Sequence, residues 1–177
     1  VIVSDVGQHQ MAASRYSRYE VPRTSITSGG LGTMGFALPA AIGAKLAAQD
    51  RTVIAVIGDG GFQMTVQELG TIMQTSAAVK IVLLNNSYLG MVRQWQELFF
   101  ERRYSQTEME NPDFVLLAGA YRIAAQRVDA REHLRDAVQT MLATPGPYLL
   151  EVTVAKEENV FPMVPSGASI SAIKLEA

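Results

Sequence analysis

Two polar side chains follow apolar runs of strand length in this sequence. Asp59 comes just past the run at residues 52–57, and Asn86 comes just past the run at residues 80–84. Runs that are apolar at nearly every position are typical of parallel sheets, whose two faces are both covered. Ligands of such sheets bind beyond the carboxyl ends of the strands. We therefore expect Asp59 and Asn86 at a ligand-binding edge.

The spacing of Asp59 and Asn86 predicts that the two are neighbours. One loop, one helix and one strand separate them, which makes a single right-handed crossover. A carboxylate and an amide supply the hard oxygen ligands that Mg²⁺ prefers, and Mg²⁺ completes its shell with phosphate oxygens and water. Gly60 and Gly61 let the backbone approach phosphates closely. The pattern favours a metal-bridged diphosphate as the ligand.

Strand-length runs alternate with helix-period segments along the whole chain. The predicted strands are at residues 1–4, 25–28, 52–57, 80–84, 123–128 and 148–154, and the predicted helices include residues 8–16, 36–48 and 66–75. This alternation predicts one α/β domain over residues 1–177, doubly wound, with a mostly parallel sheet and helices on both faces. Residues 156–177 are expected to form a C-terminal arm.

Local signals predict where several helices begin. Thr65 and Glu68 have the spacing of a capping box, which predicts a helix starting at Val66. Asn111 and Pro112 predict another start, with the proline in the first turn. A further helix, extending to about residue 100, follows the polar turn at residues 85–87. Asp129 and Glu132 frame one more helix start.

Composition excludes several classes of protein. The 177 residues include no cysteine, so disulfides and thiolate metal sites are excluded, and the net charge of −2 argues against nucleic-acid binding. No apolar run approaches membrane-spanning length. Charged residues make up 18% of the chain, below the roughly 25% typical of soluble domains, which suggests a surface covered by a partner. The chain opens inside an apolar run without Met, so we expect a piece of a longer polypeptide.

One competing motif is present. Residues 30–35 match the G-x-G-x-x-G fingerprint of dinucleotide-binding proteins. The strand signal before this motif is short and polar, however, and a dinucleotide site leaves Gly60 and Gly61 unexplained. The diphosphate–metal interpretation is therefore favoured.

Several sequence blocks carry a family resemblance. "GDG" at residues 58–60, followed after 24 residues by "NN", resembles the thiamine diphosphate motif. The blocks "DVGQHQM" (5–11), "TSGGLGTMGFALPAAIGA" (27–44), "LGMVRQWQELFF" (89–100) and "PMVPSGAS" (162–169) are similar to the catalytic subunits of the acetolactate synthase family.

The resemblance implies a role for each matching residue. Asp59, Asn86 and the backbone carbonyl of Tyr88 would bind Mg²⁺. The diphosphate would contact Gln8, His9, Gly60 and Gly61. The backbone of Gly32 would contact the aminopyrimidine, Met34 would bend the cofactor, and Met91, Val92 and Trp95 would face the substrate.

The resemblance also implies an activity. The family decarboxylates pyruvate and joins it to a second 2-keto acid, giving acetolactate or acetohydroxybutyrate for branched-chain amino acid biosynthesis. Its members are expected to be cytoplasmic homodimers or larger homo-oligomers, some with a regulatory small subunit and some with FAD. The glutamate that activates the cofactor comes from another domain, and none of the acids here matches it. We therefore expect the isolated chain to be inactive.

Other interpretations stay open. The chain could belong to another thiamine enzyme, such as a glyoxylate carboligase, a pyruvate oxidase or a 2-keto acid decarboxylase, or to a non-catalytic binding module. The sequence departs from the family at Ala12, where tryptophan is usual, and at Ala37 and Gly61, which puts fine specificity in doubt.

Some polar and apolar positions have structural interpretations as well. Asn85 is expected to shape its turn, and His133 is expected on a solvated helix. Met91, Trp95 and Leu98 share one helical face, a pattern that without the resemblance indicates core packing.

Overall fold

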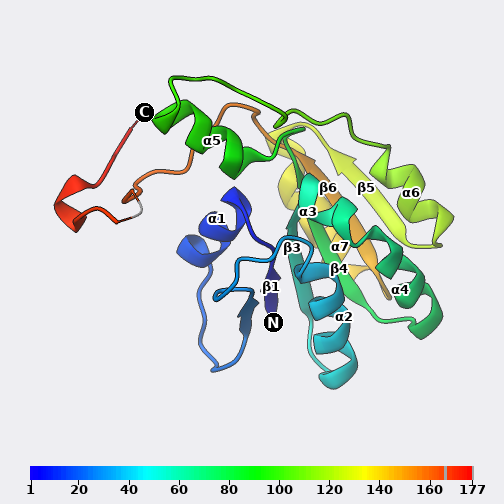
Figure 1. Cartoon of the computed structure of the whole chain (residues 1–177). Coiled ribbons are helices and arrows are strands. Elements are labelled where there is room, and N and C mark those ends of the chain that lie inside the picture. Colours follow the sequence, from blue (N-terminus) through cyan, green and yellow to red (C-terminus); the bar gives the residue numbers. More distant parts are fainter. Residues whose placement is uncertain (166, 177) are drawn as a thin grey trace.

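The computed structural model describes residues 1–165 and 167–176. Within these residues a parallel sheet of six strands has the order β2-β1-β3-β4-β6-β5 (Figure 1). The strands are β1 (Ile2–Ser4), β2 (Ser25–Thr27), β3 (Val53–Gly58), β4 (Val79–Asn85), β5 (Ala124–Val128) and β6 (Tyr148–Thr153). The prediction of an α/β fold with a parallel sheet is confirmed.

The helices cover both faces of this sheet. They are α1 (Gln8–Tyr16), α2 (Ala37–Ala47), α3 (Asp59–Met64), α4 (Leu69–Thr75), α5 (Gly90–Phe99), α6 (Phe114–Ala120) and α7 (Leu134–Ala143), with short 3₁₀ turns at Val66–Glu68, Arg131–His133 and Ile170–Ala172. Along β6, Leu149 joins the core beneath α2 and α6, whereas Tyr148 and Leu150 pack with Met141 of α7. Because successive side chains of a strand point to opposite faces, the two cores lie on opposite sides of the sheet.

The predicted capping box at Thr65 is wrong. The Thr65 hydroxyl donates to the carbonyl of Gly35 at 3.0 Å and makes no helix-cap hydrogen bond, while Glu68 accepts from the Thr71 hydroxyl. The predicted turn after β3 begins α3 at Asp59 instead, and the helix expected from Val66 is a 3₁₀ turn followed by α4. Thr65 is thus used for a contact with a distant loop.

The helix start at Pro112 is also wrong, by two residues. Helix α6 begins at Phe114, and the N-cap is Asp113, whose Oδ1 accepts from the backbone N–H of Leu116 at 2.9 Å. An aspartate N-cap satisfies an N–H that has no partner within the helix. Pro112 therefore precedes the helix. After Asp129, a 3₁₀ turn at Arg131–His133 contains Glu132, and α7 begins at Leu134.

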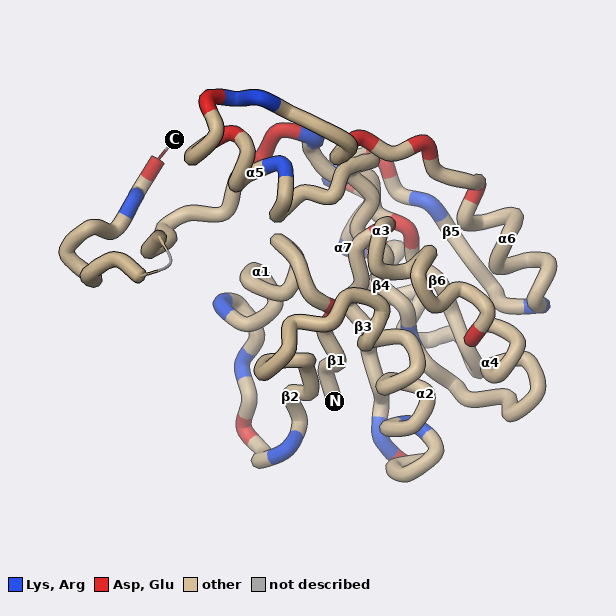
Figure 2. Tube along the Cα trace, in the orientation of Figure 1, with Lys and Arg blue, Asp and Glu red and all other residues tan. Residues whose placement is uncertain are grey.

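The segment after β6 crosses the carboxyl edge of the sheet. Gln94 of α5 donates to the carbonyl of Val160 and accepts from its N–H, and Arg15 of α1 donates to the carbonyls of Phe161 and Pro162. Figure 2 shows charged residues gathered after α5 and at the opposite end of the sheet, whereas residues 28–36 carry none. No helix in the described part of the chain is long and apolar enough to cross a membrane.

Candidate functional site

The carboxyl edge of β3 and β4 brings Asp59 and Asn86 together, as the topology predicted. Gly58 pairs in register with Leu84, so the residues that follow the two strands leave the sheet side by side. The Asp59 carboxylate accepts from the backbone N–H of Ser87, next to Asn86, at 2.8 Å. Two loops distant in sequence are therefore joined at the edge where ligands of such sheets bind.

Asp59 is a buried carboxylate, with only 2% of its surface exposed. Burial raises its pKa, although hydrogen bonds from Asn111, Gly60 and Ser87 act in the opposite direction. Within the described residues, no Lys or Arg makes an ion pair with it. A buried charge without a counter-ion is costly, so this position suits a bound cation.

Asn86 and Asn85 have different surroundings. Asn86 Oδ1 accepts from the backbone N–H of Tyr88 at 3.1 Å, and Asn86 lines the cavity described below. Asn85 points away from that cavity, because its Oδ1 accepts from the N–H of Ser87 and its Nδ2 donates to buried Glu151 at 2.8 Å. The structural role expected for Asn85 is confirmed.

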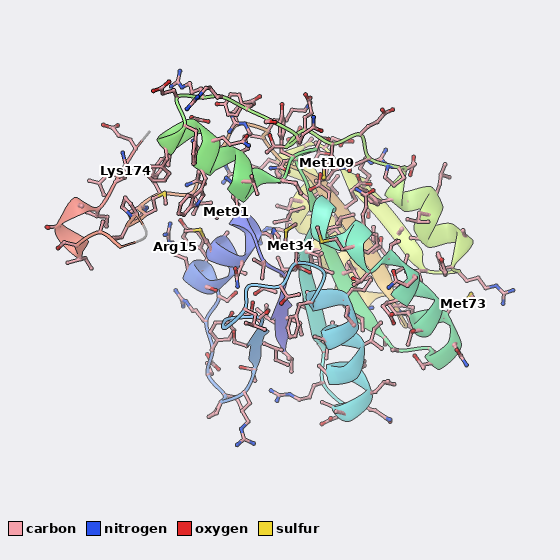
Figure 3. All side chains as sticks on the ribbon, in the orientation of Figure 1. Arg15, Met34, Met73, Met91, Met109 and Lys174 are labelled. Carbon is pink, nitrogen blue, oxygen red and sulfur yellow. The ribbon has the colours of Figure 1, made fainter. Side chains whose placement is uncertain are left out.

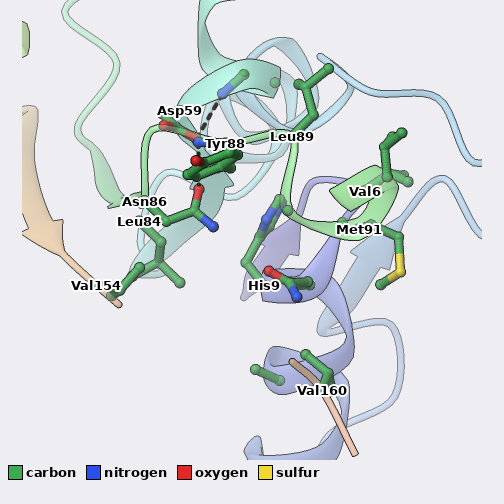
Figure 4. A pocket seen from close by; sticks show the side chains of 18 of the residues that line it. Val6, His9, Asp59, Leu84, Asn86, Tyr88, Leu89, Met91, Val154 and Val160 are labelled. Atoms are coloured by element: carbon green, nitrogen blue, oxygen red, sulfur yellow. Dashed lines mark hydrogen bonds between the residues drawn. The ribbon is translucent and has the colours of Figure 1, made fainter. Parts of the chain in front are cut away.

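A cavity of about 410 Å³ lies at this edge (Figure 4). Its walls come from α1, the loop at 28–36, the start of α3, the loop between β4 and α5 with the first turn of α5, and the segment after β6. Its lining includes Gln8, His9, Gly32, Met34, Asp59, Gly60, Gly61, Asn86, Tyr88, Met91 and Val92. The sequence-predicted site residues thus converge on one cavity, with a single exception.

The exception is Trp95, which does not line the cavity. Its side chain is 38% exposed and packs against Phe99, with the ring centroids 5.2 Å apart. Met91 lies one turn earlier on α5 and lines the cavity, as does Met34 from the loop at 28–36 (Figure 3). The face shared by Met91, Trp95 and Leu98 is only partly buried, so this stripe does not form part of the core.

His9 presents a buried nitrogen to this cavity. Its Nε2 has no hydrogen-bond partner in the structure, and burial lowers its pKa to about 4 despite the nearby charge of Asp5. The imidazole is therefore neutral at physiological pH. Since unpaired buried polar atoms are rare in folded proteins, Nε2 is suited to meet a polar ligand.

Glycines allow these elements to approach closely. A Cβ on Gly58 would lie 2.8 Å from His9 Cε1, and a Cβ on Gly60 would lie 2.7 Å from Leu89 Cδ2. Both distances are shorter than van der Waals contacts. The close approach of His9 to the backbone at Gly58, and of Leu89 to the backbone at Gly60, therefore depends on the absence of a side chain at these two positions.

Sequence reasoning missed two buried polar residues beside the cavity. Asp5 is fully buried, and its carboxylate accepts from the N–H groups of Gly35 at 3.0 Å and Ala37 at 3.1 Å, which fixes the loop that carries Gly32 and Met34. Gln94 is fully buried and accepts from Gln8 Nε2. Asp5 directly follows β1, just as Asp59 directly follows β3, and that position could have identified Asp5. Gln94 carries no comparable signal.

Comparison with known proteins identifies the class. Residues 5–152 match the family described as thiamine pyrophosphate enzyme, C-terminal TPP binding domain. That match covers most of the chain, which therefore belongs to this family of thiamine pyrophosphate enzymes.

Among curated proteins, the chain is similar to acetolactate synthases. It is 52% identical to the acetolactate synthase isozyme 2 large subunit of Escherichia coli (strain K12) over 97% of its length, and 51% identical to the acetolactate synthase large subunit of Lactococcus lactis over 94%. It is 46% identical to the chloroplastic acetolactate synthase of Arabidopsis thaliana over 99%. The chain spans 31%, 29% and 28% of these relatives, respectively.

Proposed function

We propose that this chain is the cofactor-binding part of an acetolactate synthase, which decarboxylates pyruvate and joins the product to a second 2-keto acid. The observation that carries the proposal is the cavity shared by Asp59, Asn86 and His9. The similarity to acetolactate synthase large subunits over nearly the whole chain supports the choice of reaction.

The residues around the cavity fit thiamine diphosphate with Mg²⁺. Asp59, Asn86 and the carbonyl of Tyr88 offer oxygen ligands of the kind Mg²⁺ prefers. His9 Nε2 is buried without a partner among the described residues, and Gly60 and Gly61 line the cavity without side chains. When bound, the cofactor supplies an electron sink for breaking and forming bonds at the keto carbon.

The proposed role of the chain's own residues is to bind and orient the cofactor and the substrate. Gln8 and His9 would contact the diphosphate, and the backbone of Gly32 would hold the aminopyrimidine. Met34 would pack against the cofactor from the loop fixed by Asp5. Met91 and Val92 face the substrate from α5. Trp95, outside the cavity in this structure, is proposed to contact the larger acceptor acid beyond the rim.

The assembled enzyme is proposed to contain more than this chain. The activating glutamate comes from another domain, normally of a partner subunit, and FAD and a regulatory small subunit are further proposed components. Leu31, 93% exposed, and Val92, 45% exposed, leave apolar surface near the cavity that a second subunit of a homodimer would cover. Sedimentation of the intact protein as a strict monomer at high concentration would contradict the homodimer.

Calorimetry and product analysis test the function. The intact protein is expected to bind thiamine diphosphate only weakly without Mg²⁺ and to form acetolactate from pyruvate, and acetohydroxybutyrate when 2-ketobutyrate is added. An Asp59→Ala variant should lose the Mg²⁺-dependent binding. If the wild-type protein does not bind thiamine diphosphate, the chain belongs to a non-catalytic module. If it forms a different product from pyruvate, it belongs to another thiamine enzyme.

A further inference from the structure

Asn111 touches Asp59 from the side away from the cavity. Asn111 precedes α6 and does not line the cavity, but its Nδ2 donates to Asp59 Oδ2 at 2.7 Å. It lines a separate polar cleft together with Arg127 and Glu151. Asn111 is therefore in contact with a proposed metal ligand while lying outside the volume available to the cofactor.

The orientation of the Asn111 amide is fixed by three partners. Nδ2 also donates to Asn85 Oδ1 at 2.9 Å, and Oδ1 accepts from Gln63 Nε2 at 2.9 Å. If the amide were rotated by 180°, its oxygen would face the oxygens of Asp59 and Asn85. The donor capacity of Nδ2 is fully used on these two acceptors.

Asn85, one of the two acceptors of Asn111, is itself held by a further hydrogen bond. Asn85 Nδ2 donates to Oε1 of Glu151, which is 1% exposed, and Arg127 Nε donates to Oε2 of the same carboxylate at 2.9 Å. A continuous set of hydrogen bonds therefore connects Asp59 through Asn111 and Asn85 to an ion pair on β5 and β6. Such a network holds its members in one arrangement.

The two oxygens of Asp59 consequently differ. Oδ2 accepts from Ser87 N at 2.8 Å and from Asn111 Nδ2 at 2.7 Å. Among the described residues, the one hydrogen bond to Oδ1 comes from the adjacent N–H of Gly60, at 3.1 Å. Oδ1 therefore has free acceptor capacity, whereas Oδ2 already accepts from two strong donors. Asn111 and Ser87 thus both bond Oδ2 and leave Oδ1 as the oxygen more available to a cation.

We propose that Asn111 is a positioning residue for the metal: it holds Asp59 Oδ2 from behind so that Oδ1 is the oxygen that binds Mg²⁺. This inference rests on the metal site of the proposed function. Groups that orient a metal ligand typically contribute 10- to 100-fold to metal affinity. Asn111→Ala removes the donor, and Asn111→Asp places a second carboxylate against Asp59 with nearly unchanged shape.

The test measures the affinity for Mn²⁺ by electron paramagnetic resonance. It uses the intact protein saturated with thiamine diphosphate. Asn111→Ala should weaken Mn²⁺ binding about 10-fold, and Asn111→Asp more strongly, toward about 100-fold. Asn159→Asp is the matched control, because Asn159 Nδ2 also donates to a carboxylate, that of Glu97, and neither residue lines the cavity or makes a hydrogen bond to Asp59. It should leave the Mn²⁺ affinity unchanged.

Two further variants separate the outcomes. Gln63→Ala removes only the partner that orients the Asn111 amide, so it should weaken Mn²⁺ binding in the same direction even if the Asn111 variants fold poorly. Wild-type Mn²⁺ affinity in Gln63→Ala and in the folded Asn111 variants overturns the inference. If Asp59→Ala also keeps wild-type affinity, the proposed metal site itself fails; if Asp59→Ala loses Mn²⁺ binding, only the role of Asn111 fails.

Discussion

Gln8, in the first turn of α1, donates a hydrogen bond of 2.9 Å to Gln94, which lies 86 residues later on α5. Gln8 Nε2 also donates to the carbonyl of Glu158, and Gln94 binds both backbone groups of Val160. Two amide side chains thus connect α1, α5 and the segment after β6, the three parts that form one wall of the cavity.

Replacing Gln94 should release the segment after β6. Gln94→Leu has similar volume but leaves the N–H and carbonyl of Val160, which are half-buried, without their partners. The penalty for a fully buried unpaired group, about 1–3 kcal/mol, is the upper bound for each. We expect faster hydrogen exchange and faster proteolysis at residues 156–163. Gln67→Leu, at an exposed position, is the control and should leave both rates unchanged. Unchanged exchange in Gln94→Leu would show that other contacts hold the segment.

Much of the fold could be predicted from local sequence, because the apolar runs and their periods belong to single elements. The strands at Val53–Gly58 and Val79–Asn85 are such cases, and parallel topology was enough to place Asp59 beside Asn86. The prediction failed where a side chain has a distant partner. Thr65 has the local pattern of a cap, but its hydroxyl bonds Gly35, 30 residues earlier.

The site shows the same division. The motifs assign roles to the residues that line the cavity, but not to the residues behind them. Asn111 looked like a helix start, yet its side chain bonds Asp59, 52 residues earlier. Gln94 lies within the block at residues 89–100, but only the tertiary structure shows that it is buried and bonds Gln8. Periodicity on α5 could not place Trp95 either, because the face it shares with Met91 is only partly covered.

Gly58→Ala should disturb the cavity through His9. The new Cβ would lie 2.8 Å from Cε1 and 2.9 Å from Nδ1 of the imidazole, so the ring would have to shift. Overpacking of this kind costs about 1–3 kcal/mol, and displacement of His9 should also weaken binding of thiamine diphosphate. Urea denaturation and calorimetry measure the two effects.

Gly43→Ala provides the matched control for Gly58→Ala. Gly43 lies within α2, and a Cβ there would meet nothing within 4 Å. Since alanine is favoured over glycine inside a helix, this variant should be more stable by about 0.5–1 kcal/mol. The same substitution should therefore have opposite effects at the two positions, and equal effects would refute the steric argument for Gly58.

Acid should destabilise the cofactor-free protein through His9. Burial holds the pKa of His9 at about 4, below the ordinary value of 6.5, so between these two values the unfolded chain binds more protons than the folded one. Stability should therefore fall as the pH drops from about 6.5 to about 4, by up to about 3 kcal/mol. Unfolding by urea at a series of pH values measures this slope.

His9→Gln removes the titrating group and should flatten the slope over that pH range. His133→Gln, which changes the exposed histidine, should leave the slope as in the wild type. A wild-type slope in His9→Gln would mean that other groups cause the acid sensitivity.

Asp5→Asn should destabilise the fold and loosen the loop at residues 28–36. The Asp5 carboxylate accepts from three backbone N–H groups, with Val6 and Gly35 on Oδ1 and Ala37 on Oδ2. An asparagine keeps one acceptor oxygen, so its amide N–H would oppose at least one buried N–H. Leaving such a donor unpaired costs about 1–3 kcal/mol, measurable by urea denaturation. Asp50→Asn, at an exposed position, should change stability by less than about 0.5 kcal/mol.

Because the loop at residues 28–36 carries Gly32 and Met34, the affinity for thiamine diphosphate should fall together with stability in Asp5→Asn. A variant that lost stability but bound the cofactor with wild-type affinity would show that Asp5 supports the core without positioning the loop.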